Sequence, residues 1–180
     1  MITRKEFAEA KNQSVHMVRR AGILLNQHEI DEMDVADFGL NDLMVEGGQM
    51  FTLMNTDRVS AKVIALFPGQ TLPEHWHTAL GEDPGKQETI RVVMGQLYFC
   101  QEGPDTLKKA TIPKAKHQCY TARNEMVMSP GDQITIEPGT RHWFQAGAEG
   151  AVLFSFASSA RDALDPFTDP EIVRVTRVID

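Results

Sequence analysis

The chain has 180 residues, 42% of them hydrophobic, so we expect one domain over residues 1–180 with a full core. Its formal net charge of −7 argues against nucleic acid and anionic membranes as partners. No run of about 18 apolar residues is present, and the first residues lack an apolar signal segment. With only two cysteines, the composition fits the reducing environment of the cytoplasm.

Residues 1–45 are predicted to form a helical extension. Thr3 and Glu6 have the spacing of a capping box, which favours a helix start at this point. The apolar stripe of this helix is predicted to stop near Gly22, and it consists of Phe7, Ala10, Ser14, Val18 and Ala21. A second short helix, or irregular turns, is expected over residues 26–43.

The pattern changes from residue 49 to residue 180, which we predict to be a β-barrel or sandwich followed by a C-terminal tail. Short apolar or alternating runs are separated by Gly, Pro, Asp and Asn, as is typical of antiparallel strands. The runs are QMFTLMN, RVSAKVIALF, TIRVVMGQLYFC, NEMVMS, DQITIE, HWFQAG and AVLFSFAS. A final strand is expected over residues 172–178.

The segment PEHWHTALGEDPGKQE, residues 73–88, contains a candidate metal site. On a strand, residues i and i+2 face the same side, so His75 and His77 would lie together, as would Lys86 and Glu88. Two imidazoles and a carboxylate suit a divalent transition metal. A His-x-His pair alone is a weak signal, but His142, in IEPGTRHWF, is a candidate fourth ligand from another strand.

Two longer motifs surround these residues. "GQTLPEHWHTALGEDPGKQETIRVVMG" and "GDQITIEPGTRHWFQA" resemble the two motifs of the cupin superfamily, with a longer gap than usual between His77 and Glu88. The resemblance covers residues 69–146. It implies an all-β cupin barrel, or double-stranded β-helix of the jelly-roll type, and a metal bound by His75, His77, Glu88 and His142.

Within the cupins, the chain is more similar to the D-lyxose isomerase family. The segments that carry this resemblance are "GKQET", "PGTRHWF" and the tail "SARDALDPFTDPEIVRV". It implies a metal-dependent isomerase of free monosaccharides, with Mn²⁺ as the expected ion and Fe, Co, Ni or Zn as alternatives. The implied reactions interconvert D-lyxose with D-xylulose, or D-mannose with D-fructose.

Isomerisation of an aldose needs a proton carrier near the metal. Lys86 is our first candidate for a catalytic group, because its strand phase places it beside Glu88; a lowered pKa or a hydrogen bond to a sugar oxygen would suit that role. Glu137 is the second candidate, as a carboxylate base five residues before His142. Asp162, with Asp165 in the same tail, is expected to bind sugar hydroxyls or to form a structural ion pair.

One position departs from the family pattern and keeps other functions open. The resemblance implies a glutamate in the strand before the tail, where this chain has Ser155 in "VLFSFASS". This favours a non-catalytic sugar-binding or transport-auxiliary cupin as an alternative. An Fe²⁺ oxygenase would use the same ligands, and a phosphosugar isomerase would need a cationic cradle, for which the lysines at 108–116 are the only candidates.

Strand alternation directs Trp76 and Trp143 away from the metal, so we expect them in the core or at an interface. Because open sheet edges need covering, we also expect a homodimer.

Overall fold

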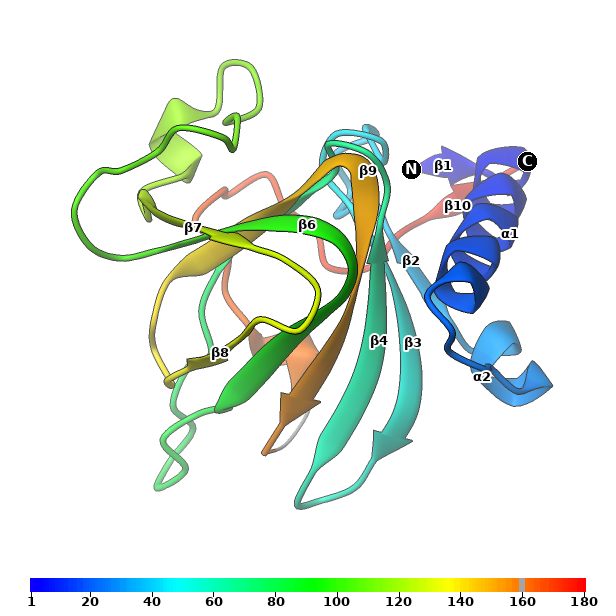
Figure 1. Ribbon diagram of the computed structural model, residues 1–180, viewed down its shortest axis with the longest axis horizontal. Helices are drawn as coiled ribbons and strands as arrows, with labels where there is room; N and C mark the ends of the chain where they lie inside the picture. Colours follow the sequence, from blue (N-terminus) through cyan, green and yellow to red (C-terminus); the bar gives the residue numbers. More distant parts are fainter. Residues whose placement is uncertain (159–160) are drawn as a thin grey trace.

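Figure 1 shows the computed structural model, which describes residues 1–158 and 161–180. Helix α1 (Arg4–Arg20) begins at the predicted capping box: Thr3 Oγ1 accepts from the Glu6 amide at 3.1 Å, and the Glu6 carboxylate accepts from the Thr3 amide at 2.7 Å. Its buried stripe, which packs on the outside of the sheet, consists of Ala10, Ser14, Met17 and Val18. None of the helices in the described residues is long and apolar enough to span a membrane.

The segment after α1 follows the prediction only in part. Helix α2 (Gln27–Asp31) is the expected short helix, but residues Asp34–Ala36 form strand β2, which pairs antiparallel with β3 (Gly48–Asn55). A strand of three residues is too short to show a period-two pattern, so no signal in the chain predicts it. The N-terminal region, expected to be helical or irregular, therefore also supplies a sheet strand.

The predicted antiparallel β-barrel is confirmed. Its sheet has the strand order β2-β3-β4-β9-β6-β7, with β5 paired to β9 and β8 paired to β6. The further strands are β4 (Ser60–Leu66), β5 (Thr71–His75), β6 (Glu88–Gln101), β7 (Asn124–Met128), β8 (Gln133–Ile136) and β9 (His142–Ala157).

Strands β6 and β9 form one long ladder that bends in the middle (Figure 1). The register shifts on both sides of Gly95, and Gly95 and Gly150 both have positive φ, +79° and +77°. The two backbones approach so closely at the bend that a Cβ atom on Gly95 would lie 2.0 Å from the Gly150 carbonyl oxygen. The bend brings the two ends of the ladder, Glu88↔Ala157 and Gln101↔His142, round to the walls of one barrel.

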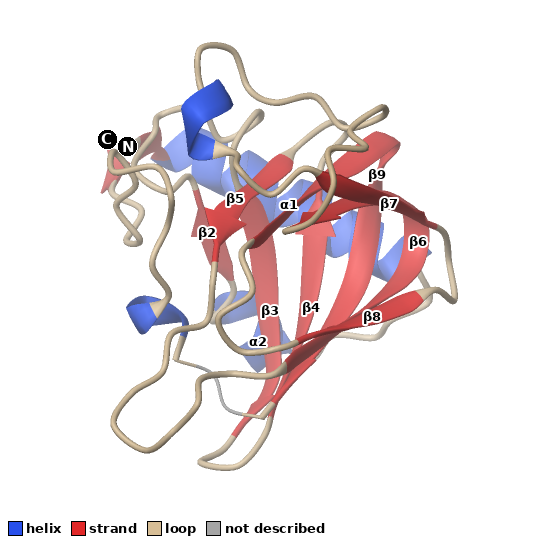
Figure 2. Cartoon of the chain, turned by 90° about the vertical axis from the view of Figure 1, so that its left-hand side faces the viewer, coloured by secondary structure: helices blue, strands red, loops and turns tan. Residues whose placement is uncertain are grey.

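Alternation along β4 separates two hydrophobic cores. Ile64 and Leu66 point into the barrel and pack in the first core. Val63 and Ala65 point outward and pack under α1 in the second, and Figure 2 shows α1 behind β3 and β4. A third, smaller cluster lies under the loop that carries the 3₁₀ helix η1 (His117–Cys119), and it contains Trp143, as predicted for that side chain.

The C-terminal tail lies along strand β5. The Glu74 carboxylate, on β5, accepts hydrogen bonds from Thr168 Oγ1 at 2.5 Å, Thr121 Oγ1 at 2.8 Å and the Ala122 amide at 2.7 Å. Glu74 is buried, so these charge-assisted bonds tie tail and loop to the barrel. The tail also contains the 3₁₀ helix η2 (Asp162–Leu164).

The expected final strand is shorter than predicted. Only β10 (Val178–Ile179) forms, paired parallel with β1 (Ile2–Thr3), so the two ends of the chain lie together beside α1 (Figure 1). Most of residues 172–178 form no strand and run beside the end of β2, where the Val173 amide donates to the Phe38 carbonyl at 2.8 Å and Thr176 Oγ1 accepts from the Asp37 amide at 2.9 Å. Arg174 lines the cavity in the barrel.

The bend predicts a sharp effect for Gly95→Ala. The new Cβ would meet the Gly150 carbonyl, so we expect the free energy of unfolding to fall by about 3 kcal/mol or more. Gly69→Ala is the matched control, because Gly69 has φ +71° and no atom within 4 Å of the place that a Cβ would take, and it should cost only about 1 kcal/mol. Urea denaturation measures both, and equal losses would contradict the close approach at the bend.

Candidate metal centre and cavity

Three imidazoles converge at one end of the barrel. His75 is the last residue of β5 and His142 is the first of β9, and the two are direct cross-strand partners. His77 was predicted to lie on a strand, but it lies two residues beyond the end of β5. Its ring still lies beside the other two. The ring centroids are 4.3 Å (His75–His142), 5.0 Å (His77–His142) and 5.6 Å (His75–His77) apart, and one ligand nitrogen from each ring lies within 4.8 Å of the other two.

Each imidazole is oriented by a backbone carbonyl. The Nδ1 atoms lie 2.8 Å from the Pro73 oxygen for His75, 2.9 Å from the Lys86 oxygen for His77, and 2.8 Å from the Thr140 oxygen for His142. Because a carbonyl only accepts, Nδ1 must carry the proton in all three rings, and each Nε2 is left with a free lone pair.

Two of these Nε2 atoms lack a partner within the part of the chain that the structure describes. The Nε2 atoms of His77 and His142 are buried and make no hydrogen bond within the described residues. Burial, and then the neighbouring rings, hold the pKa of His75 well below its usual value; burial is also the main cause that lowers the pKa of His142 to about 4. Neutral, orphaned imidazoles are the form in which histidine binds a metal, so the cluster fits a divalent transition ion.

Glu88, the first residue of β6, adds an oxygen to this cluster. Its Oε2 lies 3.2 Å from His77 Nε2, without the alignment of a hydrogen bond, and its Oε1 accepts a hydrogen bond from Ser155 Oγ. Burial opposes ionisation of this carboxyl, but Lys86 and these two neighbours hold its pKa well below the usual range. Glu88 is therefore a carboxylate beside His77, although among the described residues the group of ligand atoms that all lie within 4.8 Å of one another contains only the three histidines.

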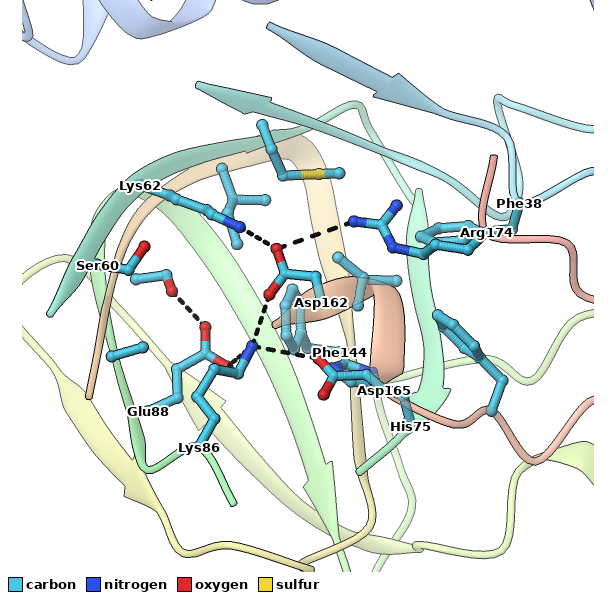
Figure 3. A pocket seen from close by; sticks show the side chains of 16 residues that line it. Phe38, Ser60, Lys62, His75, Lys86, Glu88, Phe144, Asp162, Asp165 and Arg174 are labelled. Atoms are coloured by element: carbon cyan, nitrogen blue, oxygen red, sulfur yellow. Dashed lines mark hydrogen bonds and ion pairs between the residues drawn. The ribbon is translucent and has the colours of Figure 1, made fainter. Parts of the chain in front are cut away.

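A cavity opens from this cluster into the barrel (Figure 3). His75 and Glu88 form part of its wall, whereas His77 and His142 lie behind them and are almost completely buried. The apolar wall consists of Phe38, Met50, Ile64, Leu72, Phe144, Ala157 and Phe167. The remaining polar lining consists of Ser60, Lys62, Lys86, Ser155, Asp162, Asp165 and Arg174. An apolar cavity with a few converging polar groups is typical of a small-molecule site.

Lys86 lies beside Glu88 inside the cavity, as its position two residues before Glu88 predicted, although strand β6 begins only at Glu88. Its Nζ is 3.5 Å from Glu88 Oε2, 3.0 Å from Asp162 Oδ1 and 3.3 Å from Asp165 Oδ2. Burial favours the neutral amine, but the three carboxylates outweigh it and raise the pKa of Lys86. The lowered pKa considered from the sequence is therefore not found, and the group is an ammonium.

The far side of the cavity holds two cations that the sequence reasoning missed. Lys62 Nζ contacts Asp162 Oδ2, and Arg174 NH2 lies 4.0 Å from the same oxygen. Figure 3 shows Lys62, Lys86 and Arg174 all pointing toward Asp162. Lys62 lies in the predicted strand RVSAKVIALF, where its inward-facing phase between apolar neighbours was a usable signal; Arg174, in an irregular tail, had none.

Two other sequence-predicted groups lie outside the cavity. Glu137 is exposed, and both of its carboxylate oxygens accept from Gln87 Nε2 at 3.0 Å. It is not among the described residues that line the cavity, so it could not act as a base there. The strand-end turn that carries it points to solvent. Trp76 is half-buried under Arg141, whose guanidinium lies 4.7 Å from the ring centroid.

The lysines considered for a phosphate cradle also lie elsewhere. Lys108, Lys109 and Lys114 are exposed, and Lys116 pairs with Glu46 at 2.8 Å and with Asp169 at 2.7 Å. None of the four is among the described residues that line the cavity.

Comparison with known proteins places this geometry in a family. A profile of the D-lyxose isomerase family matches residues 6–180. The D-lyxose ketol-isomerase of Cohnella laeviribosi is 47% identical over 94% of each chain, and the D-lyxose/D-mannose isomerase of Thermosediminibacter oceani is 42% identical over the full length of both.

Among solved structures, L-ribose isomerase of Cellulomonas parahominis superposes with a TM-score of 0.79 over 99% of this chain and 98% of that one, at 14% identity, which shows a shared fold. The family match over nearly the whole chain agrees with the histidine cluster, its carboxylate neighbour and the cavity beside them. The chain belongs to the D-lyxose isomerase family, a family of aldose–ketose isomerases.

Proposed function

We propose that this protein interconverts a free aldose and its ketose in the cavity beside the histidine cluster, with D-lyxose/D-xylulose and D-mannose/D-fructose as the substrate pairs to test first. The observation that carries the proposal is the set of orphaned imidazole nitrogens and one carboxylate at the end of a cavity that also holds an ammonium. The names of the two most similar relatives described above support these sugars.

The proposed ligands of the metal are His75, His77, His142 and Glu88. A divalent ion held there, Mn²⁺ in our proposal with Fe, Co, Ni or Zn as alternatives, would act as a Lewis acid that stabilises negative charge on the two sugar oxygens next to the migrating hydrogen.

The chain's own groups bind and orient the sugar. The Lys86 ammonium, held by three carboxylates, is placed to donate a hydrogen bond to a sugar oxygen that gains negative charge. Asp162 is proposed to accept from a hydroxyl farther along the sugar, in exchange for one of its present cations. The aromatic wall, which includes Phe38, Phe144 and Phe167, would exclude water from the reacting carbons.

The charges of the cavity favour a neutral sugar over a phosphorylated one. Its cations, Lys62, Lys86 and Arg174, are already paired with carboxylates. A phosphate would have to enter beside Asp162 and Asp165, which would repel it. The phosphosugar alternative therefore has no unpaired cationic cradle among the described cavity residues.

Removal of the metal is expected to abolish ketose formation and to lower the melting temperature. Reloading stripped protein with Mn²⁺, Fe²⁺, Co²⁺ or Zn²⁺ separately should restore stability by mass action, by about 2.7 kcal/mol at an ion concentration of 100 Kd. In His142→Ala the metal-induced rise in melting temperature should be lost, and in His28→Ala, at an exposed position, it should remain. A metal-induced rise in melting temperature that is as large in His142→Ala as in wild type would contradict the proposed ligand set.

The Fe²⁺ sample also tests the oxygenase alternative. Oxygen consumption without ketose formation in that sample would favour an oxygenase.

The role of Lys86 is tested by Lys86→Met, which keeps much of the side-chain volume but removes the ammonium. We expect kcat to fall about 100-fold or more, with the metal content unchanged. Lys5→Met, on the exposed face of α1, is the matched control. Full activity of Lys86→Met would show that the mechanism does not need this residue.

The non-catalytic alternative predicts a different result for the wild-type protein, namely binding of sugar without turnover.

We further propose that the protein is a cytoplasmic homodimer that pairs through the outer face of the barrel. Phe156 on this face is 44% exposed and stacks on Phe154 with ring centroids 5.5 Å apart; Met54, in the same cross-strand row, is 46% exposed. A charge in such an interface is costly, so Phe156→Glu should convert dimer to monomer, whereas Leu24→Glu, at a 92% exposed position, should not. Light scattering after gel filtration measures both, and a wild-type monomer would refute the proposal.

A further inference from the structure

Isomerisation needs a group that takes a proton from one carbon and returns it to the next. Ser155 occupies the position where the family resemblance implied a glutamate, and its hydroxyl is engaged with Glu88. Among the described residues, three carboxylates line the cavity: Glu88, Asp162 and Asp165. The hydrogen bonds and ion pairs of each decide which of them has a free oxygen to act as a base.

Glu88 has no oxygen to spare. Its Oε1 accepts from Ser155, and its Oε2 faces His77 Nε2 at 3.2 Å and Lys86 Nζ at 3.5 Å. A carboxylate in this position is engaged with the imidazole cluster and with a cation at the same time.

Asp162 is surrounded by cations. Oδ1 accepts from Lys86 at 3.0 Å, while Oδ2 contacts Lys62 and lies 4.0 Å from Arg174. Burial alone would raise the pKa of this carboxyl, but Lys86 and Lys62 lower it strongly. So many positive neighbours make Asp162 a weak base, suited to binding and not to proton transfer.

Asp165 differs from both. Its side chain is only 9% exposed and lines the cavity, and Lys86 Nζ, 3.3 Å from Oδ2, is its single hydrogen-bond partner within the described residues; Oδ1 has none there. Burial raises the pKa of Asp165, and the opposing effect of Lys86 does not cancel this rise. A buried carboxylate with one free oxygen is a stronger base than Asp162, three residues before it.

The backbone holds Asp165 next to the histidine cluster. Pro166 follows it, and the Pro166 carbonyl accepts from the Trp76 amide at 3.3 Å, between two of the imidazole-bearing residues. Phe167 forms a β-bridge with His75. These two backbone contacts of the tail place Asp165 close to where the sugar oxygens would bind.

We propose that Asp165 is the catalytic base that carries the proton between C2 and C1 of the sugar. The inference rests on the proposed isomerase function. Asp165 takes the proton from C2 of the open-chain aldose, the C2–H electron pair forms the C1=C2 bond, and the C1=O1 π pair moves to O1. Asp165 then returns the proton to C1, the C2=O2 bond forms as the C1=C2 pair takes up that proton, and the O2 proton passes to O1, so that no oxidant or reductant is needed.

The test compares Asp165→Asn with wild type on aldose deuterated at C2. The amide keeps the size of the side chain and its hydrogen bond to Lys86, but it is not a base. We expect kcat to fall about 10²- to 10⁴-fold, with KM and metal content changed less than about threefold. The exchange of the C2 label with solvent should be lost with it. Asp57→Asn, the same change at an exposed position, should leave all these quantities unaltered.

A second variant separates loss of the base from loss of structure. Asp165→Gly should be inactive, and formate, which can occupy the vacated space, should restore part of its turnover with saturating concentration dependence. Near-normal turnover and label exchange in Asp165→Asn would overturn the assignment of the base. So would a folded, metal-binding Asp165→Gly that formate does not rescue. In either case, ketose formation by wild-type protein would leave the proposed isomerase function standing. Absence of ketose from metal-loaded wild type would overturn both.

Discussion

The bend in the β6–β9 ladder is the constraint on which the rest of the structure depends. Its two glycines let backbones meet at a distance that excludes any side chain. Because the ladder folds over at this point, Glu88 at one end and His142 at the other belong to one barrel end, although they are 54 positions apart in the chain. A straight ladder of this length would separate them by far more than a metal site allows.

The site depends as much on backbone as on side chains. Three carbonyl groups, from Pro73, Lys86 and Thr140, fix the three imidazole tautomers. Lys86 and Thr140 lie outside the strands, and Pro73 lies within β5 where its register with β9 shifts, so these carbonyls are free from regular sheet pairing. The same irregular backbone positions therefore orient the three imidazoles for a metal, and they leave the Nε2 atoms of His77 and His142 without a hydrogen bond among the described residues.

The cavity combines an apolar wall with a chain of charges that compensate one another. Three cross-strand pairs of β4 and β9 follow one another in order from the open end of the cavity inward. They are Ser60 with Ala157, then Lys62 with Ser155, then Ile64 with Leu153. The polar rows thus lie near the open end and the apolar rows in the interior. Asp162 and Asp165 enter from the tail to meet these charges, so the tail completes the polar end of the cavity.

Local patterns in the sequence predicted much of this protein. Short-range rules account for the capping box of α1, the antiparallel strands and the shared side of Lys86 and Glu88. Residues one helical turn apart, or two positions apart in an extended chain, share a face. The spacing of His75, His77 and Glu88, with its resemblance to cupin motifs, was enough to identify the three histidines that the fold brings together. Even Ser155 was identified as unusual, although its bond to Glu88 was not.

Only the tertiary structure decided which carboxylates and cations meet in the cavity. Glu137 and Asp165 look alike in the sequence, one in a turn and the other in a tail. Glu137 faces solvent, whereas Asp165 lies beside Lys86 with its side chain only 9% exposed. Arg174 and Lys62, 112 positions apart, approach the same oxygen of Asp162. Such contacts depend on how an irregular tail docks on a closed barrel, and docking is set by long-range packing and hydrogen bonds, such as those of Glu74, that have no periodic trace in the chain.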